Sequence, residues 1–539
     1  MGDSAASSSW PRSTGSGRPA WRSCGRWCGS DPVGPQTPQA DLRLVPAALT
    51  AWGVTAAGIA WDAGPVLAAL CAAVGVGWWT LRRCVGAQHP GLTAATSAVL
   101  AAAAVGAGFG LAVGLRTDAV HTHPIGQRFG STAQATARPT ESPRQVGGTR
   151  LMFRADLLRL DGRETTGAVV VFASAAEFGT LGAGQPVRFR ARIARPSRRD
   201  LTVAVLTATG PPTFGTASGV QRAARAVRER FAATAREVLA VDQAAILPGL
   251  VLGDTSTVTA TTTAEFRTAG LTHLTAVSGA NVTIVCGAVL LSAYLVGPRP
   301  AVVLAALALV VFVVVVQPTA SVLRAAVMGA IALLAVLSGR RRQALPALAA
   351  TVIALMVAAP QLAVDLGFAL SVSATTGLVV LAPVFSARLV ARGWPRAAAD
   401  AFCIAAAAQL VTAPLIAAVS GRFSLVAVLA NLAVAVIIPP ITVLGTAAAA
   451  LVWLWPAGAG LLIRFTGPEL WWLLRVAHTA AAVPGASIPV PSGWTGLLTV
   501  AGATAAALAL WRWRWFRLSA AGTAVCAVAW SVSGAVGGP

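Results

Sequence analysis

Long apolar runs separated by short polar turns dominate two stretches of this 539-residue chain, from residue 42 to 115 and from residue 271 to 536. A run of about 20 apolar residues is long enough to cross a bilayer as a helix. The pattern predicts spans at 42–60, 64–81, 92–115, 271–295, 301–316, 320–338, 344–359, 366–390, 399–419, 424–453, 468–483, 494–511 and 518–536. We therefore expect a polytopic α-helical membrane protein of about 11–13 spans.

Two of these runs do not fit a simple span. The 424–453 run is too long and contains Pro439 and Pro440. It predicts a broken helix, which is tolerated only where it is buried in protein or lines a cavity. The 468–483 run is short and contains Arg475 and His478, so a re-entrant segment stays an alternative there.

Between the two stretches, over residues 149–213, the apolar period changes to two. Val187–Ile193 alternates apolar residues with arginine, which predicts a strand with one buried and one basic face. Further strands are expected at 151–160, 168–173 and 201–208, with Phe153, Phe172 and Phe189 facing the core. Short strands at this spacing fit a small barrel such as an OB fold. We expect residues 116–148 to be a polar linker.

Arginines outnumber acids ten to five over residues 149–213. One interpretation is a strand face that is simply solvated. The other is a groove that follows the backbone of single-stranded DNA through Arg188, Arg190 and Arg192.

The connector at 214–268 contains a helical pattern from 218 to 241, with one apolar stripe and arginines over the remaining surface. Such a helix either lies on the membrane surface or packs its stripe against the barrel.

Composition excludes a soluble globular protein, because 56% of the residues are hydrophobic and 11% are charged, against about 25% charged in soluble proteins. The formal net charge is +22, and all 41 basic residues are arginine. Residues 1–41 form a low-complexity basic tail that we expect to be disordered. No cleavable-signal layout precedes the first apolar run, so we expect that run to remain as a span.

The arginine distribution predicts orientation. Arginines in the tail, together with Arg82 and Arg83, favour a cytoplasmic N-terminus. Three spans then place the 149–213 domain outside the cytoplasm. The later clusters at Arg299, 340–342, 388–396 and 512–517 all fall on the inner side of the predicted order, and Arg422 is the exception. The expected location is the plasma membrane.

Polar and small residues inside the apolar runs predict a protein-lined path. Gly270–Ile284 carries His273, Ser278, Gly279 and Asn281 ahead of and within an apolar helix. Such side chains find partners only inside a bundle or a wet cavity. Ser371, Gln409 and Asn431 either line the path or hold helices together.

Arg324 lies in an apolar run, where an arginine near the bilayer centre costs about 2.5–3.5 kcal/mol. We expect it to pair with Asp365. The alternative is that it snorkels to the headgroups.

Several stretches together resemble the membrane domain of the ComEC-type DNA uptake proteins of competence. They are Gly270–Ile284, Pro318–Met328, Gly367–Ser371 and the segment from Ala430 to Pro439. The order and spacing resemble the family from about 245 to at least 440, and the 149–213 domain resembles the family's OB-like domain. The resemblance implies a channel that carries one DNA strand into the cytoplasm. His273, Ser278, Gly279, Asn281, Arg324, Ser371 and Asn431 match family motif positions as path or packing residues.

The chain departs from the family pattern in two ways. Asn281 stands where many relatives have histidine. Many relatives also continue into a metallo-β-lactamase-like domain, whereas this chain has no His-x-His-x-Asp-His run and five histidines in all. We therefore predict no metal site, no cofactor and no enzymatic activity. Expected partners are single-stranded DNA, membrane lipids, a DNA receptor, a separate nuclease and a cytoplasmic helicase-like ATPase.

Two other functions stay open on the sequence. A transporter or scaffold for a lipid or envelope polymer has similar spans and a similar broken helix. An intramembrane serine protease would use Ser278 with His273 or His478. Ser278 and His273 are five residues apart, about 140° around one helix, which is a poor geometry for a dyad.

Overall fold

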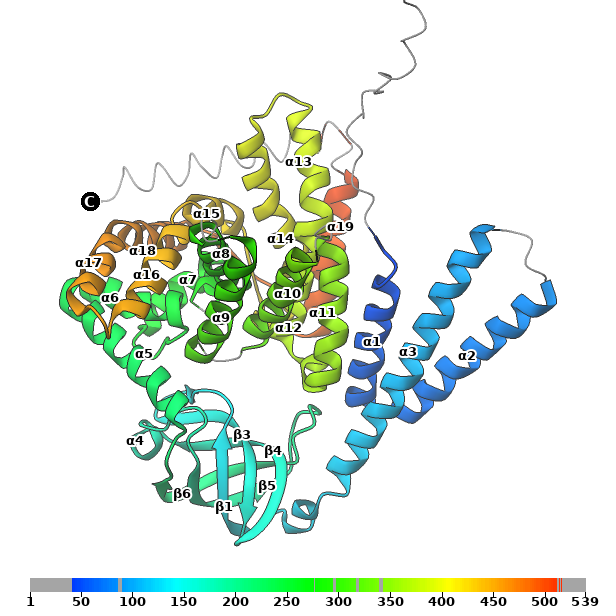
Figure 1. Ribbon diagram of the computed structural model, residues 1–539, viewed down its shortest axis with the longest axis horizontal. Coiled ribbons are helices and arrows are strands. Elements are labelled where there is room, and N and C mark those ends of the chain that lie inside the picture. The colour runs from blue at the N-terminus through cyan, green and yellow to red at the C-terminus, as the bar shows by residue number, and fades with distance from the viewer. Residues whose placement is uncertain are drawn as a thin grey trace, which may run out of the picture. The chain divides into compact units, whose positions relative to one another are not determined.

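The computed structural model describes residues 41–85, 90–275, 277–293, 297–316, 319–338, 343–510, 513 and 515. The expected tail, apart from Asp41, and the expected span at 518–536 lie outside these residues. From Leu42 onward, the described residues belong to one compact unit. It contains a small β-barrel and a set of helices (Figure 1).

Three helices precede the barrel, namely α1 (Val45–Trp61), α2 (Gly64–Val85) and α3 (Pro90–His121). Small residues let α2 and α3 approach closely, since a Cβ atom on Gly64 would lie 2.8 Å from the carbonyl oxygen of Gly110. On α1, the indole Nε1 of Trp52 donates to the carbonyl of Ala363, at 2.9 Å.

The barrel is built from η2 (Pro124–Arg128), β1 (Thr132–Pro139), β2 (Arg144–Gln145), β3 (Arg150–Leu160), β4 (Arg163–Ser174), α4 (Ala175–Phe178), β5 (Val187–Ala194) and β6 (Ala204–Phe214). The sheet order is β1-β5-β6-β4-β3-β2, and β1 also pairs with β3. That second pairing closes five strands into a barrel. The β4–β6 pair is parallel, while the other pairs are antiparallel. The expected OB-like domain is confirmed.

The linker prediction for 116–148 was wrong. Helix α3 continues to His121, and residues 132–139 form β1. The apolar positions of β1 are alanines, Ala133, Ala135 and Ala137, and all three are buried. Alanine carries little strand signal, so the polar residues between them dominated the pattern.

Local chemistry explains the β3–β4 hairpin. Leu160 pairs with Arg163, which leaves a two-residue loop of Asp161 and Gly162. Both loop residues have positive φ, at 47° and 82°, as a type I′ turn requires. Asp-Gly is a preferred sequence for that turn, so the sequence itself fixes the register here.

The helical part that follows comprises α5 (Gly219–Val238), α6 (Val241–Leu252), α7 (Ala260–Thr268), η3 (Thr272–Leu274), α8 (Gly279–Ser292), α9 (Pro298–Val316), α10 (Ala320–Leu337), α11 (Ala344–Ala358), η5 (Pro360–Val364), α12 (Leu366–Thr376), η6 (Gly377–Leu381), α13 (Ala382–Val390), α14 (Arg396–Ser420), β7 (Arg422–Ser424), α15 (Ala427–Val434), α16 (Ile438–Leu451), α17 (Pro456–Phe465), α18 (Gly467–Ala482), β8 (Ser487–Pro489) and α19 (Trp494–Leu510). Strands β7 and β8 pair with each other.

Six helices among the described residues are long and apolar enough to cross a membrane, or seven if one bent pair counts as a single span. The bent pair is α15 and α16, which meet at 53°, with Pro439 and Pro440 in the first turn of α16. The predicted broken helix is confirmed. Other expected spans are shorter apolar helices, among them α1, α8, α11 and α19.

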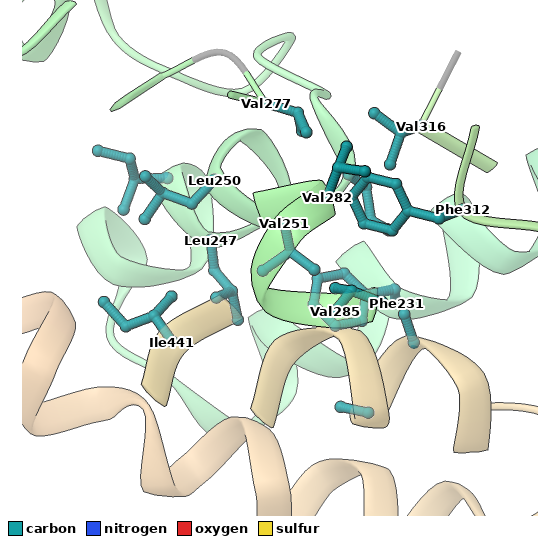
Figure 2. Close-up of a cluster of buried hydrophobic side chains, with 14 of the residues drawn as sticks. Phe231, Leu247, Leu250, Val251, Val277, Val282, Val285, Phe312, Val316 and Ile441 are labelled. Carbon is teal, nitrogen blue, oxygen red and sulfur yellow. The ribbon is translucent and has the colours of Figure 1, made fainter. Parts of the chain in front are cut away.

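Helix α5 packs differently from both expectations. Its stripe residues Phe231 and Ala235 are fully buried in a core shared with α6, α8, α9 and α16. Figure 2 shows Phe231 in this core with Leu247, Val285 and other apolar side chains. The Arg228 guanidinium donates to the carbonyl of Val315 near the end of α9, at 2.7 Å. The stripe is therefore covered by the helical part of the protein.

Candidate functional site

The polar stretch that begins at Gly270 is a turn ahead of helix α8. We expected a helix from residue 271, but α8 begins at Gly279, with Ser278 as its N-cap. The 3₁₀ turn Thr272–Leu274 lies between α7 and α8 and carries His273 on its exposed side. The polar residues therefore stand at the start of the helix, where backbone N–H groups are free of intrahelical partners.

Contacts at Gly270 fix the first end of this turn. Gly270 has a φ of +75°, and a Cβ atom there would lie 2.4 Å from Cβ of Ala427. The Asn431 amide donates to the carbonyls of Ala427, at 2.8 Å, and of Gly270, at 3.4 Å. The hydroxyl of Ser424 donates to the carbonyl of Thr268, at 2.8 Å. Asn431 therefore ties the broken helix to the turn.

Asn281 fixes the second end. It is 5% exposed, and its amide donates to the carbonyl of Leu250 near the end of α6, at 2.9 Å. Its side-chain oxygen accepts from the Ser278 hydroxyl, at 3.2 Å. A helix end leaves carbonyls without intrahelical donors, so Asn281 satisfies one of them across two helices.

Arg324 is 7% exposed, so it is buried in protein. Its Nε donates to the Ser371 hydroxyl, at 2.6 Å, and Ser321 lies 3.3 Å from the same hydroxyl. Its Nη1 lies 3.8 Å from the sulfur of Met328. A Cβ atom on Gly279 would lie 2.6 Å from Nη2. Arg324 therefore joins α8, α10 and α12.

The predicted pair between Arg324 and Asp365 was wrong. Asp365 is the N-cap of α12, and its carboxylate accepts from the backbone N–H of Phe368, at 2.8 Å. An aspartate just before a helix is a preferred cap, and this local bond holds the carboxylate at the helix start. The burial of Arg324 also excludes the alternative of a side chain that reaches the headgroups.

Ser321 was not among the predicted site residues. It lies three positions before Arg324, and residues at that spacing share one face of a helix. This spacing could have identified Ser321 as a neighbour of Arg324 from the sequence. Gln409 is half-buried on α14, and in the described part of the chain no hydrogen bond joins it to the other predicted residues.

The contacts of Ser278 and His478 do not form a catalytic dyad. The Ser278 hydroxyl donates to Asn281. The His478 Nδ1 lies 2.9 Å from the Glu265 carboxylate. Across the described ranges, no hydrogen bond joins Ser278 to His273 or His478, and no three His, Cys, Asp or Glu side chains gather as metal ligands would.

On the barrel, strand β5 has the predicted alternation, with Arg188, Arg190 and Arg192 exposed and the residues between them buried. The Arg188 guanidinium donates to the side chain of Gln134, at 2.7 Å. A hollow of about 590 Å³ lies beside Arg188 and Arg159. Arg188, Arg190 and Arg192 face solvent, where an anionic ligand can reach them, whereas Arg159 pairs with Glu164.

The core prediction for Phe172 was wrong. Phe153 and Phe189 are buried, but Phe172 is half-exposed between the buried residues Val171 and Ala173 of β4. The Arg150 guanidinium lies 5.4 Å from the centre of its ring. An aromatic ring on an outer barrel face is a feature on which bases stack in proteins that bind single strands.

Asp161 shows how this barrel holds an acid among arginines. The backbone N–H of Gln134 donates to its carboxylate, at 2.8 Å, and the Arg128 guanidinium pairs with it. The N–H bond and the Arg128 guanidinium hold the pKa of Asp161 below its usual range.

A second hollow, of about 270 Å³, is almost entirely apolar and is lined by residues of α1, α3 and α11, with Arg116 at its edge. It does not include the residues around Arg324. The buried polar side chains Asn281 and Arg324 contact protein groups rather than facing lipid.

Neither a curated protein nor a solved structure matches the chain. A protein-family model does match it, over residues 250–515, and that family is described as Competence protein. The match runs from the end of α6 to just beyond α19, so it includes the turn at Gly270, Arg324, Ser371 and the broken helix. The chain is a multi-pass membrane protein that carries a domain of the Competence protein family over residues 250–515.

Proposed function

We propose that this protein forms a path through the plasma membrane by which single-stranded DNA enters the cytoplasm during competence. The observation that carries the proposal is the family match over residues 250–515. Buried polar side chains within that region support it, because such groups are costly inside a membrane and mark pathways for polar substrates.

In this proposal the N-terminus is cytoplasmic and the barrel lies outside. The positions of the arginines support this orientation, since Arg82 and Arg83 lie in the last turn of α2 and basic residues favour the cytoplasmic side. The barrel would then meet incoming DNA first, through its exposed arginines and the outer ring of Phe172.

Uptake of labelled DNA tests the path directly. Cells that lack the gene should take up no labelled strand into the cytoplasm, and the wild-type gene should restore it. Normal uptake in the deleted strain would refute the proposal. Normal uptake together with an envelope defect would favour a transporter or scaffold for a lipid or envelope polymer.

Salt dependence tests the barrel's part. Purified full-length protein should bind a fluorescent oligonucleotide weakly at low salt and lose it as salt rises. Each phosphate contact on a single strand adds about 0.7 to the slope of log K against log salt. The double variant Arg190→Gln/Arg192→Gln should therefore lower that slope by about 1.4.

The matched control is Arg222→Gln/Arg236→Gln, which removes the same charge from the exposed face of α5. It should leave the slope within error of the wild type. Equal effects of the two double variants would mean that the protein attracts DNA only through its net charge.

A further inference from the structure

Residues from the first two turns of three helices meet around Arg324. Gly279 opens α8, Ser321 and Arg324 lie in the first two turns of α10, and Ser371 lies in the second turn of α12. Figure 1 shows these three helices in the green part of the ribbon. The N-terminal end of a helix carries about half a positive charge. Thr319 caps α10 and Asp365 caps α12, so the uncapped helix end beside the guanidinium is that of α8.

No carboxylate neutralises Arg324 in the described part of the chain. It contacts neutral groups, namely the Ser371 hydroxyl and the Met328 sulfur. Asp365 directly precedes α12, and its carboxylate caps that helix by accepting from the N–H of Phe368. A buried charge normally has an oppositely charged partner, so this guanidinium lacks the usual compensation.

The start of α8 lacks the usual side-chain cap as well. Ser278 is of a type that accepts from N–H groups of the first turn, but here it makes no such bond. Its hydroxyl donates to Asn281 instead. Since Gly279 has no Cβ atom, Nη2 of Arg324 comes close to the helix backbone. The uncapped helix start and the guanidinium are therefore adjacent.

We infer that Arg324 and the first turn of α8 together bind a phosphate group. Two positive groups held side by side repel each other, and an anion that contacts both of them removes that repulsion. Free N–H groups at a helix start bind phosphate well, and a guanidinium adds paired donors. The Ser321 and Ser371 hydroxyls orient the guanidinium from the opposite side.

This inference rests on the proposed function for the source of the phosphate, which is then a phosphodiester of the passing DNA strand. A lipid headgroup offers the same chemistry. One buried site of this kind engages one phosphate at a time, and such binding must stay weak enough for the strand to leave.

Thermal unfolding with inorganic phosphate tests the site in the purified full-length protein, in phosphatidylcholine nanodiscs at constant ionic strength. A ligand that binds only the folded state raises the midpoint. We expect phosphate, relative to chloride, to raise the wild-type midpoint by roughly 2–4 °C. Arg324→Gln should abolish this rise, and the control Arg464→Gln, on an exposed part of α17, should keep it.

Gly279→Ala keeps every charge and serves if Arg324→Gln does not fold. The added methyl group displaces the far end of the Arg324 side chain and lies 3.2 Å from Cβ of Ala325. The flexible guanidinium can move away, so the protein should fold and lose most of the phosphate effect. A phosphate effect that is the same in the wild type, Arg324→Gln and Gly279→Ala would overturn the inference.

Two further measurements separate the sources of phosphate. If nanodiscs with phosphatidylglycerol remove the wild-type response to phosphate, the site belongs to a lipid headgroup rather than to DNA. If the response persists, a lipid headgroup is excluded as the ligand. A site for DNA then requires that Arg324→Gln cells show at least a tenfold loss of uptake with unchanged protein level. A gene deletion that leaves uptake normal defeats the proposed function but leaves the phosphate response intact, so the two failures are distinguishable.

Discussion

The barrel and the helical region treat arginine in opposite ways. On β5, Arg188, Arg190 and Arg192 are exposed and their neighbours in the strand fill a dry core. In the helical region, Arg324 is 7% exposed and bonded to neutral groups. An arginine in solvent costs little free energy and shows only which face of the strand is exposed. A buried arginine is tolerated because of the residues around it. Those residues come from distant segments, which a sequence pattern does not reveal.

The largest test of this comparison concerns the dry interior of the barrel. Phe178 is fully buried, and its ring centre lies 5.6 Å from that of Phe189. Phe178→Ala should therefore lower the free energy of unfolding by about 3–5 kcal/mol. Denaturant unfolding of the full-length protein measures this loss, with proteolytic cleavage of the barrel as the signal for its unfolding.

The matched variant is Phe172→Ala, which trims the same side chain on the outer face. It should cost less than about 1 kcal/mol. If the two variants lose similar unfolding free energy, the assignment of Phe178 to the barrel core and of Phe172 to its outer face is wrong.

The next test concerns the neutral partner of the buried charge. Ser371→Ala removes the hydroxyl that accepts from Arg324, and hydrogen bonds to charged groups contribute about 1.5–3 kcal/mol. We expect a loss of that size in the free energy of unfolding. In an Arg324→Met background the same change should cost much less, since no charge is then left without an acceptor.

A double-mutant cycle measures this coupling between Ser371 and Arg324. Stability is read from unfolding in nanodiscs at fixed pH. If the Ser371→Ala cost is equal in both backgrounds, the 2.6 Å bond contributes nothing that depends on the charge.

The smallest effect concerns Asp161 on the barrel surface. Its pKa is lowered on folding, so it adds stability above its unfolded pKa of about 3.9. That contribution disappears as the pH falls through the lowered value. A surface ion pair contributes about 0–1 kcal/mol, so the effect is small.

Unfolding midpoints measured from neutral pH down to about pH 3 detect this contribution. Asp161→Asn tolerates the positive φ of the turn and should remove part of the acid-dependent loss. The control Asp156→Asn, on the exposed side of β3, should retain it. Identical profiles for the wild type and Asp161→Asn would show that the Gln134 and Arg128 contacts do not depend on the charge.

Where a strand has one solvent-exposed and one buried face, the sequence pattern predicted it correctly. Val187–Ile193 predicted both the strand and the direction of its arginines, and Pro439 with Pro440 predicted the break between α15 and α16. Phe172 was misassigned because aromatic residues usually face a core, and no feature of the sequence around it indicates that this ring points outward from β4. Helix α8 was placed too early because the apolar residues Leu271, Leu274 and Val277 alternate with the polar residues of the turn and continue the apolar run of the helix.

The sequence by itself determined the membrane class, the OB-like domain and the family resemblance, because periodicity and composition are local properties. Only the tertiary structure decided that Asn281 bonds to Leu250 and that Arg324 meets Gly279 and Ser371 rather than Asp365. Those contacts join residues 31 to 47 positions apart. They depend on which helices pack together, and helices that are apolar on all sides give no sequence signal for that choice.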